Sequence, residues 1–521
     1  MTSEAPSAPS LPPASAGAPP APARAPRAFG PPRPPDASGA PGAPGTPGAS
    51  GAPREPREFG GECRLPDAAP QVKRPTVEEL RLTSFKSYRR ATLPLSPLTV
   101  LHGPSGAGKS NALDALSVLS RLALGEEIKP SLDGIGGPSG PLAVPVRGGL
   151  AGCVPHGRNA IILGCTVRSR AGTIRLEVVV RTDERVRIAR ELLTLDGQTV
   201  METGEQDLGR GRINVTWHND SRQGDIRAPM PSSRLVTAQL PLRVAGSTNG
   251  ERKVLAASEQ LLTALREVFA LHPVPAAMRG WTRPEPQARL LGTAANLSAV
   301  LGRLKQECQR RWARLLRAVQ AAAPHPLLGL DVARRGEGDR LRLLAVFDEG
   351  VLGRTGADQA SDGMLRLLAF AAVLLTGADV LDVDPAGEVP DAHRQLVLLA
   401  EDLGAGLAAD QIGALLRLAR EVTGKGDMRL LAALQEPGPA LALDGVELVE
   451  CRRDPATGHS LLRRTDPGGR VPAQGGARAD LPAAPEAASG TVLGTGPASG
   501  ARSASGAGTV LGTGTVVDLG A

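Results

Sequence analysis

A run of glycines and small residues at positions 103–110 carries the residue types that bind phosphate groups. It has the spacing G-x-x-x-x-G-K-S of a phosphate-binding loop. An apolar stretch at 99–102 precedes the loop, and leucines recur at helical spacing over 111–122. The sequence therefore predicts a strand, a loop and a helix. The predicted nucleotide contacts are Gly103, Pro104, Ser105, Gly106, Ala107, Gly108, Lys109, Ser110 and Asn111.

The chemistry of this loop follows from its residue types. Glycines allow the backbone to curl through positive φ, so that its N–H groups and the helix N-terminus surround an anion. Lys109 is predicted to reach the β- and γ-phosphates of ATP and to assist catalysis by neutralising their charge. Ser110 is a predicted Mg²⁺ ligand. The alternative is a chance match in a chain with 63 glycines, but the flanking strand and helix favour a phosphate-binding loop.

A second polar group stands at positions 361–363, directly before an apolar segment that is predicted to be a helix over 364–376. Ser361, Asp362 and Gly363 would lie at that helix N-terminus, where a hydroxyl, free N–H groups and the positive end of the helix dipole meet an anion. The same residues are also typical of a simple N-cap. The pattern alone leaves both interpretations open.

The elements that must position these residues occupy the middle of the chain. Residues 1–74 and 466–521 are dominated by Pro, Ala, Gly, Ser and Thr, which predicts disordered tails. The second tail holds two copies of TVLGTG, too short and too few for a repeat fold. A single P-loop nucleotide-binding head is predicted over 75–465, with a β-rich and helical insert at about 125–345.

Within this head the hydrophobic pattern predicts several kinds of element. Three strands are expected over 77–102, antiparallel strands over 160–217, helices over 251–325 and a strand pair over 327–350. Residues 125–158 are rich in Gly and Pro and are expected to form a long loop. One continuous helix is expected from Asn296 to about 322.

Composition limits the function classes. The net charge of +7 permits contact with nucleic acid without requiring it, while an aromatic content of 2% does not favour base stacking. The five cysteines form no C-x-x-C pair, so no zinc site or disulfide framework is expected, and a cytoplasmic location fits. The sequence shows neither a long apolar run nor a signal peptide, so we expect no membrane association.

Three separated stretches together resemble the ABC-type ATPase heads of the RecF/SMC class, in the compact branch of bacterial AAA-family ATPases of actinobacterial type. They are LTSFKSYRRATLPLSPLTVLHGPSGAGKSNALDAL, NLSAVLGRLKQE and ASDGMLRLLAFAAVLL. The resemblance covers about residues 76–435. It implies an α/β fold: a P-loop NTPase with a mixed β-sheet core, an antiparallel β subdomain and a helical insert.

The resemblance also implies site roles and partners. Ser361 and Gly363 would contact the γ-phosphate held by the loop of a second head, so ATP binding would form a homodimer with two composite pockets. DNA is a candidate partner, and the setting would be DNA repair, genome maintenance or defence. A protein partner is left unidentified.

The sequence departs from the family at its acidic strand. The family strand ends in two carboxylates before a proline, whereas here it would end Leu381-Asp382-Val383-Asp384-Pro385. The resemblance implies Asp382 as the Mg²⁺ carboxylate and Asp384 as the catalytic one, although the two aspartates are also typical of a strand exit. The family's switch histidine is replaced by Gln435 and Glu436. Gln239 is a candidate for the family's glutamine that responds to the bound Mg²⁺, although its spacing from the loop is long.

Two functions remain open from the sequence. The first is an ATPase that acts as an ATP-dependent dimerising switch. The second is a nucleotide-binding scaffold with a degenerate catalytic site and little turnover, which the departures at Val383 and Asp384 favour. A small-molecule kinase is less favoured, because the 361–363 segment would have no role in it.

Overall fold

The computed structural model describes residues 74–137, 140–143, 145–222, 224–377, 381 and 394–465. The two predicted tails and most of the 378–393 segment therefore lie outside the described residues. None of the helices among the described residues is long and apolar enough to cross a membrane.

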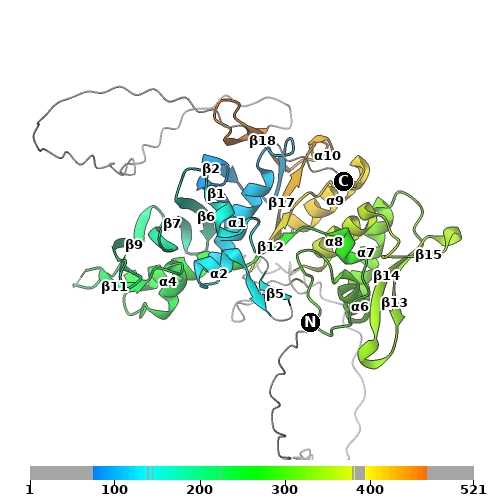
Figure 1. The fold of residues 1–521 in the computed structure, drawn as a ribbon, viewed down its shortest axis with the longest axis horizontal. Coiled ribbons are helices and arrows are strands. Elements are labelled where there is room, and N and C mark those ends of the chain that lie inside the picture. Colours follow the sequence, from blue (N-terminus) through cyan, green and yellow to red (C-terminus); the bar gives the residue numbers. More distant parts are fainter. Residues whose placement is uncertain are drawn as a thin grey trace, which may run out of the picture. The chain divides into compact units, whose positions relative to one another are not determined.

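One large sheet of 14 strands organises the chain (Figure 1). Its order is β11-β10-β9-β8-β7-β6-β1-β2-β19-β18-β3-β17-β16-β12. The strand bounds are β1 Thr76–Phe85, β2 Tyr88–Pro94, β3 Leu98–His102, β6 Ala160–Ser169, β7 Gly172–Arg181, β8 Arg187–Leu195, β9 Gln198–Asp207, β10 Arg212–Trp217, β11 Ile226–Pro231, β12 Val268–Leu271, β16 Leu396–Ala400, β17 Met428–Leu434, β18 Glu447–Arg453 and β19 Ser460–Thr465.

The last five strands in that order, β18 to β12, run parallel to one another. β3 and β16 are buried at every position. Such uninterrupted apolar runs are typical of strands with both faces covered. These strands form the predicted P-loop core.

The other half of the sheet is antiparallel from β11 to β1 and β2. In β7 buried residues alternate with half-buried ones, which is the pattern of a strand with one face on the core. The prediction of antiparallel strands over 160–217 is confirmed by β6–β10. The three strands predicted over 77–102 are confirmed by β1, β2 and β3, and the first two pair as an antiparallel hairpin.

The helix after the phosphate loop joins the two halves of the sheet. α1 (Lys109–Ala123) packs against β1, β6, β12 and β17, and against α4 (Asn249–Arg266). α4 starts with a capping box in which Thr248 and Glu251 satisfy each other's backbone N–H groups. The predicted long loop at 125–158 instead contains α2 (Ile128–Asp133), β4 (Ile135–Gly137), β5 (Gly140–Ala143) and α3 (Gly149–Cys153).

A second core lies among helices and a small sheet. The helices are α6 (Leu297–Glu307), α7 (Gln309–Ala322), α8 (Asp362–Thr376) and α9 (Ala409–Thr423). The small sheet has the order β13 (Gly329–Arg335), β14 (Arg342–Asp348) and β15 (Arg354–Gly356). Besides α2 and α3, the short helices among the described residues are η1 (Thr237–Leu242), α5 (Pro275–Met278), η2 (Gly338–Arg340), η3 (Gly350–Leu352) and α10 (Gly438–Leu441).

The expectation of one continuous helix from Asn296 to about 322 is wrong. Cys308 has extended backbone geometry and separates α6 from α7. The break lets the two helices pack on each other, and Leu301 of α6 and Leu315 of α7 enter the same core. Local helix propensity does not reveal such a break, because packing of the two apolar stripes decides it.

Candidate nucleotide-binding site

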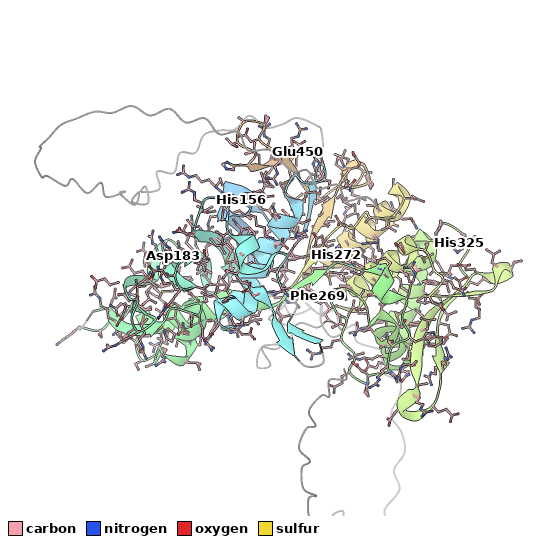
Figure 2. The ribbon with its side chains drawn as sticks, in the orientation of Figure 1. His156, Asp183, Phe269, His272, His325 and Glu450 are labelled. Carbon is pink, nitrogen blue, oxygen red and sulfur yellow. The ribbon has the colours of Figure 1, made fainter. Side chains whose placement is uncertain are left out.

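The carboxyl ends of four parallel strands meet at one edge of the large sheet. β3 leads into the phosphate loop, β17 into Gln435, β16 into Glu401 and β12 into His272. In parallel sheets this edge is where ligands bind. The start of the loop is fixed to its neighbour, since the Gly103 N–H donates to the Gln435 carbonyl at 3.2 Å. His272 is labelled in Figure 2 beside the end of β12.

The loop has the conformation that its glycines allow. Gly103, Gly106 and Gly108 have φ values of 140°, 77° and 115°, a region that side chains with a Cβ rarely adopt. Two of them also have no room for a side chain: a Cβ on Gly103 would overlap the Cys451 carbonyl oxygen, and one on Gly108 would overlap the Ser460 hydroxyl. The predicted strand, loop and helix are thus confirmed as elements.

Lys109 stands at the first position of α1 and is buried. Its ammonium donates to the carbonyls of Gly103 at 2.7 Å and Pro104 at 3.0 Å, so the side chain folds back over the loop. Burial lowers the pKa of Lys109, while the Cys451 thiol and the Asp402 carboxylate oppose that shift. A partly desolvated cation beside curled N–H groups is suited to an incoming polyphosphate.

The remaining predicted contacts differ in exposure. Pro104, Ser105 and Gly106 are exposed at the tip of the loop, and Ala107 is buried behind it. Ser110 and Asn111 are half-buried in the first turn of α1. The Asn111 amide donates to the Ser87 hydroxyl at 2.9 Å. The structure therefore brings all nine residues of 103–111 to the same sheet edge.

Sequence analysis missed two carboxylates at this edge, Glu401 and Asp402. They follow β16, which lies two strands from β3 and so about 10 Å away at the usual strand spacing. The charge of Asp402 acts to raise the pKa of Lys109, against the effect of burial. The signal was present as LVLLAED, an apolar run followed by two acids.

Glu401 belongs to a network of ion pairs. Arg147 donates through one nitrogen to Glu401 at 2.9 Å and through the other to Asp114 on α1 at 2.8 Å. Lys86, in the turn between β1 and β2, also contacts Asp114 at 2.7 Å. The His272 ring nitrogen Nδ1 lies 3.8 Å from the second Glu401 oxygen. The network connects the end of β16 to the helix that follows the phosphate loop.

The polar segment at 361–363 lies at the N-terminus of α8, as expected. Ser361 is the N-cap, and its hydroxyl accepts from the Met364 N–H at 3.2 Å. Asp362 pairs with Arg279 at 2.6 Å, and both Ser361 and Asp362 are exposed. Gly363 is pressed against the loop after Glu401, because a Cβ there would overlap the Gly406 carbonyl oxygen.

The predicted acidic strand falls on a part of the chain that is mostly not described. Asp382 and Asp384 lie outside the described residues, and Leu381 forms an isolated parallel bridge with Leu290. The first described strand after α8 in the large sheet is β16, and the residue before Glu401 is the buried Ala400. A metal-holding carboxylate is therefore not found at that position of β16.

Gln239 is not at the phosphate loop. Its amide donates to the carbonyls of Pro231, Arg234 and Leu235 within its own segment. That segment contacts the far end of α1, since Arg234 donates to the Gly125 carbonyl at 3.0 Å. A 15-residue helix is about 22 Å long, which separates Gln239 from Lys109.

No protein-family model matches this chain, and no curated protein matches it. Solved structures do. The Smc head bound to the C-winged helix domain of ScpA has 13% identity over 75% of this chain and 98% of its own, with a TM-score of 0.42. The Smc head with an extended coiled coil bound to the C-terminal domain of ScpA, derived from Pyrococcus furiosus, has 12% identity over 75% and 96%, with a TM-score of 0.40.

The SMC head domain from Thermotoga maritima has 13% identity over 75% of this chain and 99% of its own, with a TM-score of 0.35. These neighbours belong to the class of heads that the sequence resembles. The assignment of a P-loop α/β fold rests on the strand order and the loop geometry of this chain.

Proposed function

We propose that this protein binds ATP in the loop at 103–110 and hydrolyses it as a dimerising switch of the RecF/SMC type. The observation that carries the proposal is the loop itself: three glycines at positive φ, a folded-back Lys109 and a helix that starts at once. A loop of that geometry at the carboxyl edge of parallel strands binds phosphate through its N–H groups.

The residues at this edge fit ATP with Mg²⁺. The loop N–H groups and Lys109 suit the phosphate chain, and the Ser110 hydroxyl together with the Glu401 and Asp402 carboxylates supplies the oxygen donors that Mg²⁺ prefers. When bound, the ion would neutralise charge on the β- and γ-phosphates. Ser110 and a carboxylate of this pair would hold it.

Glu401 is the carboxylate best placed, among the described residues, to orient the attacking water. It directly follows β16, two strands from β3. Arg147 donates to one of its oxygens, and the His272 ring lies 3.8 Å from the other. Such positioning of a nucleophile is most of what an NTPase site contributes beyond charge stabilisation. Asp384 remains the alternative that the sequence resemblance implied.

The second half of the proposed site would come from another copy of the chain. Ser361 and Asp362 are exposed at the N-terminus of a 15-residue helix, so a phosphate group could approach them. Ser361 and Gly363 would close over ATP bound in the loop of the partner, which gives two pockets per dimer. DNA repair, genome maintenance or defence is the setting proposed for this switch, with DNA as a candidate ligand.

A second function is favoured by specific features of the site. Ala400 precedes Glu401, Arg147 occupies an oxygen of Glu401, and Gln435 follows β17 in place of a switch histidine. A chain with these features could bind ATP, dimerise and turn over little. ATP would then shift a monomer–dimer equilibrium without being consumed quickly.

The test is steady-state ATP hydrolysis with Mg²⁺, with and without DNA, alongside equilibrium binding of ATP. The ATPase proposal expects turnover by the wild-type chain that Lys109→Ala abolishes. The scaffold expects ATP-dependent dimerisation without turnover. A wild-type chain that binds no ATP would overturn both.

A further inference from the structure

Three consecutive carbonyl groups of the phosphate loop accept hydrogen bonds from side chains outside the loop. The Gly106 oxygen accepts from Arg453 Nε at 2.8 Å, and the Ala107 oxygen from the Ser460 hydroxyl at 2.6 Å. Both donors belong to the hairpin of β18 and β19, near the C-terminal end of the described chain.

The third carbonyl is held from β2, the strand next to β19 in the sheet. The hydroxyl of Tyr88, the only tyrosine of the chain, donates to the Gly108 oxygen at 3.0 Å. The Cys451 thiol adds a weak bond to the Ala107 oxygen at 3.3 Å and lies 3.3 Å from the Tyr88 hydroxyl. We call Tyr88, Cys451, Arg453 and Ser460 the outer wall of the loop. Because residues 103 and 108 are glycines, this wall can contact the loop backbone directly.

The wall itself is held in place. Arg453 also donates to the Gly458 carbonyl at 2.8 Å across the turn of its hairpin. In that turn Asp454 accepts from the Ala456 N–H and the Thr457 hydroxyl, both at 2.9 Å. The Ser460 hydroxyl is 2.7 Å from that of Ser87, and the Ser460 N–H donates to the Ser87 carbonyl at 3.0 Å.

These bonds have a consequence for the inner side of the loop. In a planar trans peptide the C=O and the N–H of the next residue point in opposite directions. Carbonyls held outward at 107 and 108, the latter also accepting from the Ala112 N–H in the first turn of α1, therefore orient the N–H groups of Gly108 and Lys109 toward the inner side. The Ala107 N–H, which shares a peptide with the Gly106 carbonyl, donates to the Pro104 carbonyl at 3.3 Å, so the Arg453 bond to Gly106 supports the turn that shapes the loop. An anion nest that is already formed avoids much of the ordering cost of binding.

We propose that Arg453 and Ser460 of the β18–β19 hairpin, together with Tyr88, are positioning residues for nucleotide binding, which hold the phosphate loop open from outside. The inference rests on the proposed function, and it adds that the affinity for ATP depends on a hairpin about 350 residues away in sequence. None of the three side chains needs to touch the nucleotide.

The test compares matched single substitutions in the full chain. Tyr88→Phe removes one hydroxyl without changing charge, and Arg453→Ala removes the donor to Gly106. Arg452→Ala is the control, because Arg452 is the adjacent exposed arginine and pairs with Glu450 on its own strand. ATP with Mg²⁺ is titrated by calorimetry, and the midpoint of thermal unfolding is recorded without and with ATP.

We expect Kd for ATP to rise about 5- to 20-fold for Arg453→Ala and about 3- to 10-fold for Tyr88→Phe, as one lost hydrogen bond allows. The effect should fall on KM more than on kcat, and Arg453→Lys should restore part of the affinity. A smaller ATP-induced shift of the melting midpoint, with the ATP-free midpoint nearly unchanged, separates positioning from a general loss of stability.

Unchanged Kd in both variants would overturn the inference while leaving the proposed function intact. An equal weakening by Arg452→Ala would also overturn it, because surface charge alone would then explain the result. A wild-type chain that binds no ATP overturns the proposed function and this inference with it. Ser460→Ala extends the series and should raise Kd in the same direction.

Discussion

The two polar segments at 103–110 and 361–363 differ in how completely their own chain surrounds them. The phosphate loop is fixed on its outer side by three side chains and on its inner side by Lys109. The segment at 361–363 has an N-cap bond and one ion pair, and Ser361 stays exposed. One region is prepared to receive a ligand, and the other is available to a second molecule.

This difference matches what a composite site requires. A phosphate cradle must be rigid before ATP arrives, since ordering it later would reduce affinity. A contact made across a dimer must instead be accessible in the monomer. If either region supports turnover without the other, the site is not composite, and single variants rank the residues that each region contributes.

The largest effect is expected for Glu401→Gln. Loss of the carboxylate that orients water should lower kcat by about 10²- to 10³-fold with ATP binding retained. Asp384→Asn is the matched control, because the sequence resemblance assigned this role to Asp384. Single-turnover ATP hydrolysis measures both. Loss of turnover in Asp384→Asn with full activity in Glu401→Gln would reverse the assignment.

Ser361→Arg should lower turnover by about 100-fold while leaving ATP binding intact, because a bulky cation would hinder the approach of the partner loop. Mixing it 1:1 with Lys109→Ala should recover about one quarter of wild-type activity: half of the dimers are mixed, and each has one intact pocket. ATPase assays of the single variants and of the mixture measure this. No recovery in the mixture would argue against sites shared between two copies.

Arg147→Ala tests whether the ion pair at Glu401 supports the site or restrains it. We expect kcat to fall about tenfold, because Glu401 would lose the group that orients it. Arg147→Lys should retain part of the rate. Arg168→Ala is the control, as it removes another half-exposed arginine paired with one glutamate, Glu78, away from this edge. A rise in kcat would instead identify the Arg147 pair as a brake.

The sequence predicts the phosphate loop and the 361–363 helix start because both depend on local features: glycine spacing, a cap and the periodicity next to it. β16 escaped prediction as a site strand because LVLLA is typical of any buried strand, Ala400 stands where the family has its first carboxylate, and no proline follows Glu401 and Asp402. What makes Glu401 a candidate is its place two strands from β3, which only the folded sheet defines.

The wall around the phosphate loop could not be predicted for a different reason. Arg453 and Ser460 reach Gly106 and Ala107 from about 350 residues away, and nothing in their own segment indicates a partner. The break at Cys308 is similar, because helix formers continue on both sides of it. Long-range packing decides both features, and single-sequence patterns do not contain it.

Gly363→Ala tests the contact between the 361–363 segment and the loop after Glu401. The new methyl group would overlap the Gly406 carbonyl, so we expect a loss of about 1–3 kcal/mol in the free energy of unfolding. Gly413→Ala in α9 is the control: its Cβ would meet only the flexible end of Arg417, and alanine favours a helix interior. Denaturant unfolding of both variants measures the difference. Equal stability of the two variants would show that the contact between Gly363 and the Gly406 carbonyl does not limit stability.

The last expected effect is a pH dependence of the free energy of unfolding, and it comes from a residue outside both polar segments. Glu191 on β8 is fully buried and accepts from the N–H groups of Val236 and Thr237 at 2.7 and 2.6 Å. Burial raises its pKa from 4.5 to about 7, although these bonds act in the opposite direction. The folded chain therefore holds the Glu191 proton more tightly than the unfolded chain does.

The stabilisation linked to that proton should be complete below pH 4.5 and should be lost as the pH rises through about 7. The slope is at most about 1.4 kcal/mol per pH unit. Other carboxylates, such as Asp331, whose pKa is lowered, titrate with the opposite sign. The measurement is therefore the difference in the free energy of unfolding between the wild-type chain and Glu191→Gln from pH 4.5 to 8. The advantage of the wild-type chain should shrink across that range, and a constant difference would show that Glu191 keeps its charge in the folded sheet.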